Sequence, residues 1–297
     1  MSLQHINYHS LKSVKNILVT GANGQLGMEF RVLAETFSEY RFLFVTREEL
    51  PIDDINAVKN YFSKNQIDCC INCAAYTAVD KAESEKEQAI AINATAVGNL
   101  ASVCKEYKTL FFHFSTDYVF NGQATEPYKE TDPTDPVNFY GQTKLQGEAV
   151  ALENNEAAII IRTSWVYSRY GKNFVKTMLR LMQEKESIGV VADQFGCPTY
   201  AADLASAVMQ IIGKENVEPG IYHYCNDGLI SWYDLAVAIK EISNSNCIVN
   251  AIETAAYPTP AARPHYSALD THKIKAQYSL QISGWKESLQ ECLVGML

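Results

Sequence analysis

The chain has 297 residues, enough for one large α/β domain or a domain with a smaller lobe. Hydrophobic residues make up 47% and charged residues 20%, a composition typical of a folded globular protein rather than a disordered one. The net charge of −9 disfavours nonspecific binding to nucleic acid or to anionic membranes. No apolar run is long enough for a membrane span, and residues 1–14 lack the apolar core of a signal peptide, so they are expected to form a short extension.

Apolar runs alternate with amphipathic stretches through the first half of the chain. The runs predict strands at Ile17–Thr20, Arg41–Thr46, Asp68–Cys73, Thr109–Ser115 and Ala158–Arg162. The stretches between them predict helices at Gln25–Phe37, Asp54–Lys64, Lys81–Tyr107 and Tyr140–Asn154. This alternation is typical of a doubly wound, Rossmann-type parallel sheet with helices on both faces.

After about Ser164 the alternation becomes less regular. Gly189–Val191 and Tyr222–Cys225 are candidate strands, Asp203–Ile212 and Trp232–Ile242 are candidate helices, and the proline-rich stretch Thr254–Pro264 predicts an irregular loop. We therefore expect a dinucleotide-binding domain mainly over residues 15–165. A smaller substrate lobe is expected mainly over residues 166–297, with the chain crossing back to the sheet.

The run Gly21-Ala22-Asn23-Gly24-Gln25-Leu26-Gly27 follows the first predicted strand and begins the first predicted helix. Glycine permits a tight turn and close approach of a pyrophosphate, and the helix N-terminus presents free N–H groups to an anion. The alternative is that these glycines only form a turn and bind no ligand. Because strand and helix flank the glycines in the required order, Gly21, Asn23, Gly24, Gln25 and Leu26 are candidate dinucleotide-binding residues.

Two later strand ends add candidate cofactor contacts. Arg47 follows the second strand, where an acidic residue usually binds the adenosine ribose; a cation there suits a 2′-phosphate and favours NADP over NAD. The alternative is a solvated arginine beside Glu48 and Glu49. Asp53 is a candidate adenine contact or a helix cap. The small residues Ala74 and Ala75 would let a cofactor lie flat against the end of the third strand, with Tyr76 as a further candidate contact; the alternative is tight packing between strand and helix.

A tyrosine and a lysine stand four residues apart at the start of a later helix. Tyr140 and Lys144 share one helix face, so the ammonium can favour phenolate and bring the tyrosine pKa towards working pH. Thr116 ends the fourth strand and can donate a hydrogen bond to the same carbonyl oxygen; Asp117 follows it. Tyr8 and Lys12 show the same spacing, but they precede the first strand and serve as a decoy.

Eight cysteines are scattered along the chain. Cys70 and Cys73 have CxxC spacing, but no second ligand pair stands nearby and both fall in or beside an apolar run, which favours buried structural thiols over zinc or redox chemistry. A reducing cytoplasm is the simplest compartment.

From about Val14 onward the chain resembles the dTDP-4-dehydrorhamnose reductase family, a branch of the extended short-chain dehydrogenases/reductases. The segments that carry the resemblance are ILVTGANGQLG, NCAAYTAVDKAE, FSTDYVFNG, YGQTKLQGE, IRTSWVYS, NFVKTMLRL, VVADQFGCPTYAADLA and ARPHYSALDTHKI. It implies NADPH-dependent reduction of the C4 ketone of dTDP-4-dehydro-L-rhamnose, with NADH as a second candidate donor, in the last step of dTDP-rhamnose biosynthesis for cell-surface polysaccharide.

The resemblance also implies roles for single residues. Tyr140 would protonate the alkoxide, Lys144 would tune Tyr140 and bind the nicotinamide ribose, and Thr116 would orient the ketone. The residues expected on the sugar-nucleotide side are Thr116, Asp117, Tyr140, Trp165, Asn173, Gln194, Thr199 and Arg263. Trp165 would pack on the sugar and Arg263 would bind the diphosphate; the alternatives are a core tryptophan and a surface arginine.

Related functions remain open at this stage. Sugar-nucleotide 4,6-dehydratases carry glutamate where this chain has Tyr118, which argues against dehydration, whereas epimerases or reductases of another keto-sugar nucleotide are harder to exclude. The regulatory subunit of methionine adenosyltransferase resembles the same reductases and acts by binding a partner. The family forms homodimers, and some members bind Mg²⁺ through interface carboxylates, but no residue here maps to those ligands and no metal ligand is assigned.

Overall fold

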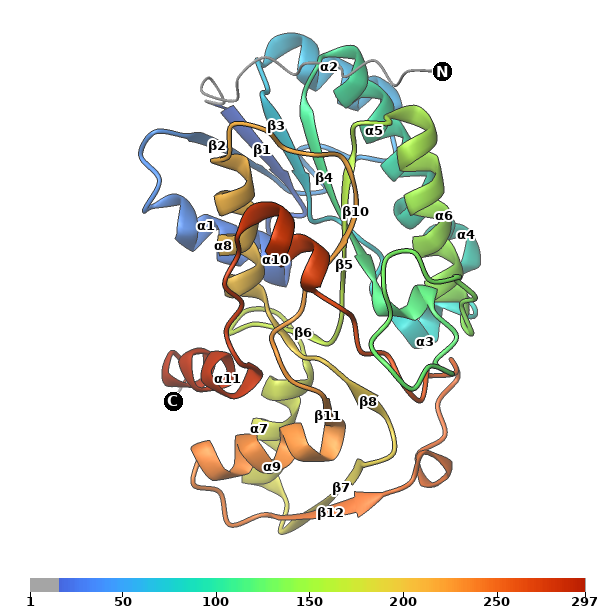
Figure 1. Cartoon of the computed structure of the whole chain (residues 1–297), viewed down its shortest axis with the longest axis vertical. Coiled ribbons are helices and arrows are strands. Elements are labelled where there is room, and N and C mark those ends of the chain that lie inside the picture. The colour runs from blue at the N-terminus through green and yellow to red at the C-terminus, as the bar shows by residue number, and fades with distance from the viewer. Residues whose placement is uncertain (1–15, 297) are drawn as a thin grey trace.

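The computed structural model describes residues 16–296 and is built around a six-stranded parallel sheet (Figure 1). The strands lie in the order β10-β5-β4-β3-β1-β2. Their bounds are β1 Asn16–Thr20, β2 Arg41–Val45, β3 Cys69–Asn72, β4 Leu110–Thr116, β5 Ile159–Thr163 and β10 Gly220–His223. The expected extension over residues 1–14, with the decoy pair Tyr8 and Lys12, lies outside the described residues.

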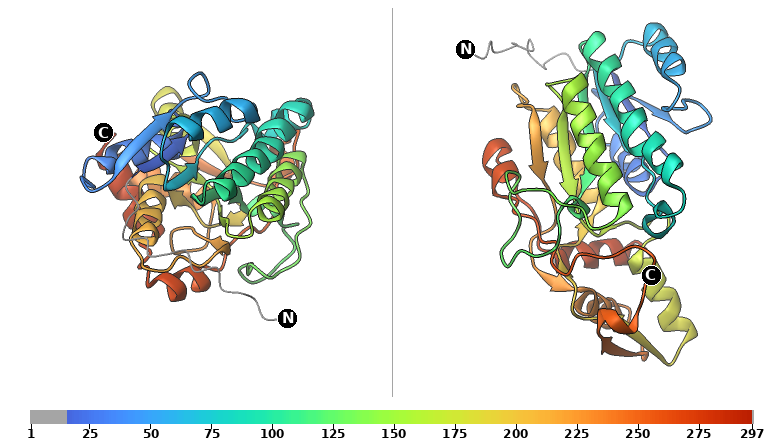
Figure 2. Two further views of the ribbon diagram at one scale, coloured as in Figure 1. Left: turned by 90° about the horizontal axis from the view of Figure 1, so that it is seen from above. Right: turned by 90° about the vertical axis from the view of Figure 1, so that its right-hand side faces the viewer.

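Helices cover both faces of this sheet (Figure 2). One face carries α1 Gln25–Ala34, α8 Ala201–Ile212 and α10 His272–Tyr278; the other carries α2 Ile55–Lys64, α5 Ala96–Glu106 and α6 Phe139–Asn154. The predicted fold class, a doubly wound sheet with a smaller C-terminal lobe, is confirmed. Because β10 joins the sheet, the chain returns to it after leaving, although the division near residue 165 stays a prediction.

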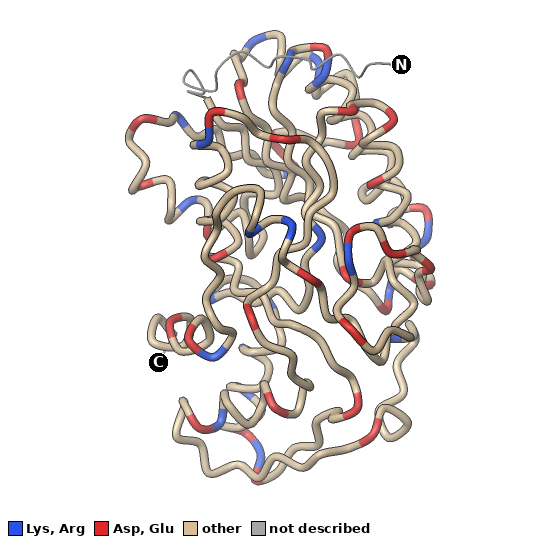
Figure 3. The backbone as a smooth tube through the Cα atoms, in the orientation of Figure 1, with Lys and Arg blue, Asp and Glu red and all other residues tan. Residues whose placement is uncertain are grey.

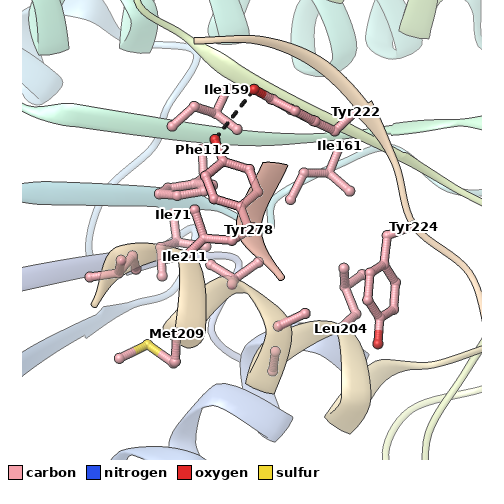
Figure 4. Packing of buried hydrophobic residues seen from close by; sticks show 14 of the residues in the cluster. Ile71, Phe112, Ile159, Ile161, Leu204, Met209, Ile211, Tyr222, Tyr224 and Tyr278 are labelled. Carbon is pink, nitrogen blue, oxygen red and sulfur yellow. Dashed lines mark hydrogen bonds between the residues drawn. The ribbon is translucent and has the colours of Figure 1, made fainter. Parts of the chain in front are cut away.

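The strands are buried on both sides, which explains their continuous apolar sequences. In β1, Ile17 and Val19 pack into one core cluster whereas Leu18 packs into the other. Figure 4 shows the first cluster between the sheet and α8, where the hydroxyl of Tyr278 donates to that of Tyr222 at 3.3 Å. Two cores therefore fix the sheet between its helix layers.

The lobe contains three helices and short strand pairs (Figure 1). The helices are α7 Phe174–Glu184, α9 Trp232–Ile242 and α11 Trp285–Val294. The strand pairs are β7 Ser187–Val191 with β12 Ile248–Ile252, β6 Val166–Tyr167 with β9 Thr199–Tyr200, and β8 Phe195–Gly196 with β11 Ile230–Ser231. Residues 254–264 form a loop as predicted, apart from the short 3₁₀ turn η4 Thr254–Ala256.

The single helix expected over Lys81–Tyr107 is wrong. The structure divides it into α3 Val79–Ala82, α4 Lys86–Ile90, the π-helical turn η2 Ala91–Thr95, and α5. Residues 83–85 interrupt the helix between α3 and α4, whereas α4, η2 and α5 follow one another without a gap. Within η2 the Asn93 side chain accepts from the backbone N–H of Tyr76 at 2.8 Å and donates to its carbonyl at 3.0 Å, a tertiary contact at the π-helical turn.

Charge and thiols are spread through the molecule. Figure 3 shows acidic and basic residues distributed over both the sheet-bearing part and the lobe. All eight cysteines are free; Cys70 is buried as expected, whereas Cys73 is half-buried and lines a pocket. Among residues 16–296, no helix combines the length and apolar character needed to cross a membrane.

Candidate active site

The glycine turn between β1 and α1 approaches the end of β3 closely. Gly21 has a φ of +63°, and a Cβ at this position would lie 2.6 Å from the backbone nitrogen of Ala74. Only glycine tolerates both conditions. Gly24 is the N-cap of α1 and provides no side-chain cap, so the first backbone N–H groups of the helix are left for another acceptor.

This turn forms one end of a pocket of about 490 Å³. The pocket brings together most of the cofactor contacts predicted from the sequence, namely Gly21, Asn23, Gly24, Arg47, Asp53, Ala74, Ala75 and Tyr76. It also contains Leu50, Ile52, Gln88 and Ile92, which the sequence did not single out. An elongated polar ligand with a flat apolar end, such as a dinucleotide, suits this lining.

The cation expected after β2 lies at the rim of the pocket. The Arg47 side chain is 65% exposed, and its guanidinium lies 3.8 Å from the carboxylate of Asp53. Glu49 does not compete for this arginine in the structure, because its carboxylate accepts from the backbone N–H of Thr46 at 2.8 Å. Arg47 is thus available to a phosphate at the pocket edge.

Thr116, Asp117 and Tyr140 meet at the carboxyl edge of the sheet. Thr116 ends β4 and begins the 3₁₀ turn η3 Asp117–Val119; its hydroxyl lies 3.0 Å from Oδ1 of Asp117. Tyr140 is the second residue of α6, whose N-cap Asn138 accepts from the Gly141 backbone at 2.8 Å. The Thr116 hydroxyl also lies close enough to Tyr140 to lower the pKa of its phenol. The structure therefore juxtaposes the predicted hydroxyl pair.

Burial dominates the electrostatics of this group. Burial raises the pKa of Tyr140, the charge of Asp117 raises it further, and the Thr116 hydrogen bond lowers it. Burial also raises the pKa of Asp117 to about 7, against hydrogen bonds from Ser267 and Thr116. Within residues 16–296, Oδ2 of Asp117 is buried and has no hydrogen-bond partner. Tyr140 thus keeps its proton at neutral pH.

The sequence predicts that Lys144 acts on Tyr140, but the structure shows other partners for it. Its ammonium does not lower the pKa of Tyr140 in this structure: the nitrogen donates to the carbonyl of Phe114 at 2.6 Å and lies 3.3 Å from Nε2 of His113. The side chain is buried, which lowers the pKa of Lys144 to about 8 while the carboxylate of Glu148 opposes the shift. The sequence placed the lysine on the correct helix face but not its partners.

Trp165 occupies a strained position at the start of the lobe. Its φ is +48°, a conformation that costs a non-glycine residue free energy and persists where surrounding contacts hold it. Its ring stacks on Trp232 with centroids 3.5 Å apart, and a Cβ on Gly196 would lie 2.7 Å from it. The half-buried ring of Trp165 is therefore stacked on Trp232, and the absence of a side chain on Gly196 leaves room for it.

The other residues predicted on the sugar-nucleotide side have protein partners here. Gln194 donates to the Thr254 hydroxyl at 3.1 Å. Thr199 has no exposed surface and its hydroxyl bonds that of Thr163 at 2.9 Å, so the structure does not bring Thr199 to a ligand-accessible surface.

Asn173 and Gln25 bond each other instead of facing a ligand. Nδ2 of Asn173 donates to Oε1 of Gln25 at 2.8 Å. Gln25 and Leu26 contribute the first turn of α1, yet neither lines the pocket described above. This pair joins the glycine turn to the lobe.

Arg263, expected at a diphosphate, forms a bidentate pair with a residue that the sequence reading missed. Its two terminal nitrogens donate to the two carboxylate oxygens of Asp80 at 2.5 and 2.9 Å. The Arg263 side chain is 19% exposed, so a ligand phosphate would have to share it with Asp80 or displace that carboxylate. The signal for Asp80 was available, since it stands in the segment after β3.

Metal binding finds no support in the described part of the chain. Among residues 16–296, no group of three or more His, Cys, Asp or Glu side chains could hold an ion. The Mg²⁺ considered from the resemblance therefore has no site to which it can be assigned.

Comparison with known proteins agrees with the architecture and the site. The model of the RmlD substrate binding domain family matches residues 15–297. A dTDP-4-dehydrorhamnose reductase from Aggregatibacter actinomycetemcomitans is 42% identical over 284 residues, covering 92% of this chain and 97% of that protein.

Two solved structures are similar throughout. The structure of a dTDP-4-dehydrorhamnose reductase from Clostridium acetobutylicum has a TM-score of 0.91 and 38% identity, covering 95% of this chain and 99% of that one. The Bacillus anthracis reductase, solved in complex with NADP, has a TM-score of 0.90 and 37% identity with the same coverage. The chain therefore belongs to the RmlD family of extended short-chain dehydrogenases/reductases, which includes the dTDP-4-dehydrorhamnose reductases.

Proposed function

We propose that this protein is an NAD(P)H-dependent reductase that converts dTDP-4-dehydro-L-rhamnose to dTDP-L-rhamnose, the last step of dTDP-rhamnose biosynthesis. The observation that carries the proposal is the proximity of Thr116 and Tyr140 at the edge of a sheet that also holds the pocket of about 490 Å³ beside the glycine turn. Family membership supports the same reaction, since relatives with about 40% identity bear this activity in their names.

Reduction of the ketone needs a hydride and a proton. The bound cofactor supplies the hydride to C4 of the sugar. Tyr140 donates its phenolic proton to the oxygen that becomes the hydroxyl, and the raised pKa of its buried side chain keeps that proton in place at neutral pH until charge develops on the oxygen. Thr116 orients the same oxygen through its hydroxyl.

The cofactor that suits the pocket best is NADPH. Arg47 stands where the adenosine ribose lies in such folds, and its exposed guanidinium can bind a 2′-phosphate through two hydrogen bonds. The NADP complex of the Bacillus anthracis relative supports this choice. Lys144 is the residue we assign to the nicotinamide ribose, once the cofactor competes with Phe114 for its donors.

The substrate lies between the sheet edge and the lobe in this proposal. Trp165 packs against the sugar ring, and Arg263 binds the diphosphate after exchanging Asp80 for phosphate oxygens. Asp117, with one buried oxygen unpartnered among the described residues, can hydrogen-bond a sugar hydroxyl. A homodimer in solution remains our expectation, to be checked by light scattering.

The decisive experiment measures NADPH oxidation with dTDP-4-dehydro-L-rhamnose made in situ by the upstream dehydratase and epimerase, and identifies the product by NMR. Formation of dTDP-L-rhamnose supports the proposal. Cofactor binding without turnover would redirect it to another keto-sugar nucleotide. Co-purification with a methionine adenosyltransferase, with no turnover, would support a regulatory role.

A further inference from the structure

A chain of buried polar side chains crosses the sheet behind Lys144. Thr20, Asn72 and His113 occupy facing positions on β1, β3 and β4, and each is 1% exposed. The Thr20 hydroxyl donates to Oδ1 of Asn72 at 2.7 Å, Nδ2 of Asn72 lies 3.1 Å from Nδ1 of His113, and Nε2 of His113 lies 3.3 Å from Nζ of Lys144. The proposed reaction uses Lys144 and leaves the other three unexplained.

The partners of Asn72 fix the tautomer of His113. Oδ1 of Asn72 accepts from the backbone N–H of Ala74 at 3.2 Å, and a backbone N–H can only donate. The oxygen of the amide is therefore on that side, and its NH₂ group faces His113. Nδ1 of His113 must accept, which places the single proton of a neutral imidazole on Nε2. Burial and the charge of Lys144 lower the pKa of His113 well below its usual range, so the ring is neutral.

Lys144 is thus faced by a donor. An ammonium has only donors, so it and the Nε2–H of His113 oppose each other, whereas the lone pair of a neutral amine accepts that N–H and still donates to Phe114. The other titratable groups around the lysine are Glu148, whose charge raises the pKa of Lys144, and Tyr140, four residues earlier on the same helix face; Asp117 on the adjoining turn acts on Tyr140.

Glu148 does not cancel this effect. Its carboxylate is occupied by a buried pair with Arg162, in which Nη2 lies 2.7 Å from Oε2, and by the hydroxyl of Ser115. Its attraction for the lysine charge is therefore shared with a second cation. His113 is itself 1% exposed, so the ring is enclosed by the protein.

We propose that His113, held in its Nε2–H tautomer by Asn72, is a positioning residue that presents a hydrogen-bond donor to Lys144 and favours the neutral amine. Burial of the lysine acts in the same direction. The consequence for catalysis rests on the proposed function: Lys144 returns a proton to the Tyr140 phenolate after each turnover and is itself reprotonated from water. A lysine that gives up its proton near neutral pH does this readily.

The tautomer can be tested without any turnover. In wild-type protein labelled with ¹⁵N-histidine, the His113 signals should show an unprotonated Nδ1 and a protonated Nε2 between about pH 5 and 8, the range in which an unperturbed histidine titrates. Assignment comes from the loss of these signals in His113→Asn. A proton on Nδ1, or a doubly protonated ring at pH 7, overturns the proposal whether or not the protein is a reductase.

The effect on Lys144 is measured by NMR titration of ¹³C-lysine protein, with the signal assigned from Lys144→Met. His113→Asn keeps an acceptor for Asn72 but removes Nε2–H, so the pKa of Lys144 should rise by about one pH unit. The carboxylate of Asn72→Asp accepts a hydrogen bond from Nδ1–H, which leaves the Nε2 lone pair facing the lysine, so the pKa of Lys144 should rise in this variant as well. Thr20→Val is the control and should leave it unchanged, because Ala74 still orients the amide.

An unchanged or lower pKa of Lys144 in folded His113→Asn overturns the proposal. If the reductase activity is present, the high-pH limb of the kcat profile should move upward with the same pKa, which a purely structural histidine would not cause. If activity is absent, the titration still decides, so failure of this inference and failure of the proposed function are distinguishable.

Discussion

At the scale of single residues, Tyr140 offers the sharpest test of the chemistry. Tyr140→Phe removes only the transferable proton, because the ring and its packing remain. We expect kcat to fall by about 10²–10⁴-fold with NADPH affinity nearly unchanged. Turnover and cofactor fluorescence titration check this. Tyr118→Phe is the matched control, since the Tyr118 ring lies edge-on to that of Tyr140 with centroids 6.0 Å apart. Equal losses of kcat in both variants would contradict the assignment of Tyr140 as the proton donor.

Asp117 should make stability depend on pH. Burial raises its pKa to about 7, so ionisation opposes folding: its contribution is most favourable below the ordinary pKa near 4 and is lost as pH rises through 7. The free energy of unfolding of Asp117→Asn, relative to that of the wild type, should therefore be larger at pH 8 than at pH 5 by on the order of 2–4 kcal/mol. Urea unfolding of both proteins at the two pH values measures this; parallel pH dependence would contradict it.

Arg47 should determine the choice of cofactor. Arg47→Ala removes a charge-assisted contact with the 2′-phosphate and nothing that NADH can use, so the affinity for NADPH should fall by about tenfold and that for NADH little. The side chain is 65% exposed, which keeps the effect modest. Isothermal titration with both cofactors gives the comparison. Arg180→Ala, an exposed arginine paired with Glu184 in the lobe, is the control; equal losses for the two cofactors would contradict the assignment.

The sequence predicted those site residues whose place follows from the pattern of strands and turns. It did not predict which side chains bond one another. The glycine turn and the strand ends placed Gly21, Arg47 and Ala74 around one pocket because strand ends of a parallel sheet converge. Lys144 lies on helix α6, and its partner His113 belongs to strand β4, which is distant in the sequence. His113 lies inside an apolar run, FFHFST, and that run was its only sequence signal.

At the scale of elements, strands and isolated helices follow from periodicity, and α9 has the predicted bounds Trp232–Ile242. The long helix predicted over 81–107 is interrupted at residues 83–85 and contains a π-helical turn at Asn93, whose side chain bonds the backbone of Tyr76 and the hydroxyl of Thr143. No local pattern encodes such a contact. The two-residue strands β6, β8, β9 and β11 of the lobe could not be predicted because two residues carry no period, whereas the five-residue β7 overlaps the predicted strand Gly189–Val191.

Two contacts hold the loop over residues 254–264 to the sheet-bearing part: the Asp80–Arg263 pair, and the bond that Nδ2 of Asn138 donates to the carbonyl of Ala262 at 2.8 Å. Asp80 pairs with Arg263 and also accepts from the backbone N–H of Ala261 at 3.2 Å. Asp80→Asn should raise hydrogen exchange in this loop by about tenfold while α8 is unchanged, because a charge-assisted pair is replaced by a weaker contact. Exchange measured by mass spectrometry reports both segments.

The Asp80–Arg263 anchor should weaken in acid. The hydrogen bond from Arg263 lowers the pKa of Asp80, so the anchor is complete above the ordinary aspartate pKa and is lost as pH falls through the lowered value. Asp193, which accepts from the backbone of Thr254 at 2.9 Å, holds the other end of the loop. Asp193→Asn should therefore affect exchange near residue 254 and not near Arg263. Identical exchange maps for the two variants would show that the anchors are not separate.

At the scale of the whole molecule, the sheet-bearing part and the lobe meet at the N-terminal end of α1 (Figure 1). Nδ2 of Asn173 bonds Gln25 on α1 and the carbonyl of Ser168, while its Oδ1 accepts from the Lys176 backbone and so caps α7. The Ser168 hydroxyl donates to buried Glu29 on α1 at 2.6 Å. The helix end to which the proposed function assigns the cofactor phosphates is therefore hydrogen-bonded directly to the N-cap of α7, the first helix of the lobe.

These hydrogen bonds between α1 and the lobe, which we call the joint, should couple the binding of the cofactor to the binding of the sugar nucleotide. A dinucleotide that orders the first turn of α1 also orders Asn173 and α7, so a dTDP-sugar should bind more tightly to the cofactor-loaded protein, by about fivefold or more. Asn173→Ser keeps an N-cap for α7 but loses the amide donor to Gln25, so the ratio of the two affinities should fall towards one while the cofactor still binds. Titration of dTDP-L-rhamnose with and without NADP⁺ measures the ratio. An unchanged ratio in the variant would mean that the two sites communicate through the ligands themselves, which would meet at the sheet edge, and not through this joint.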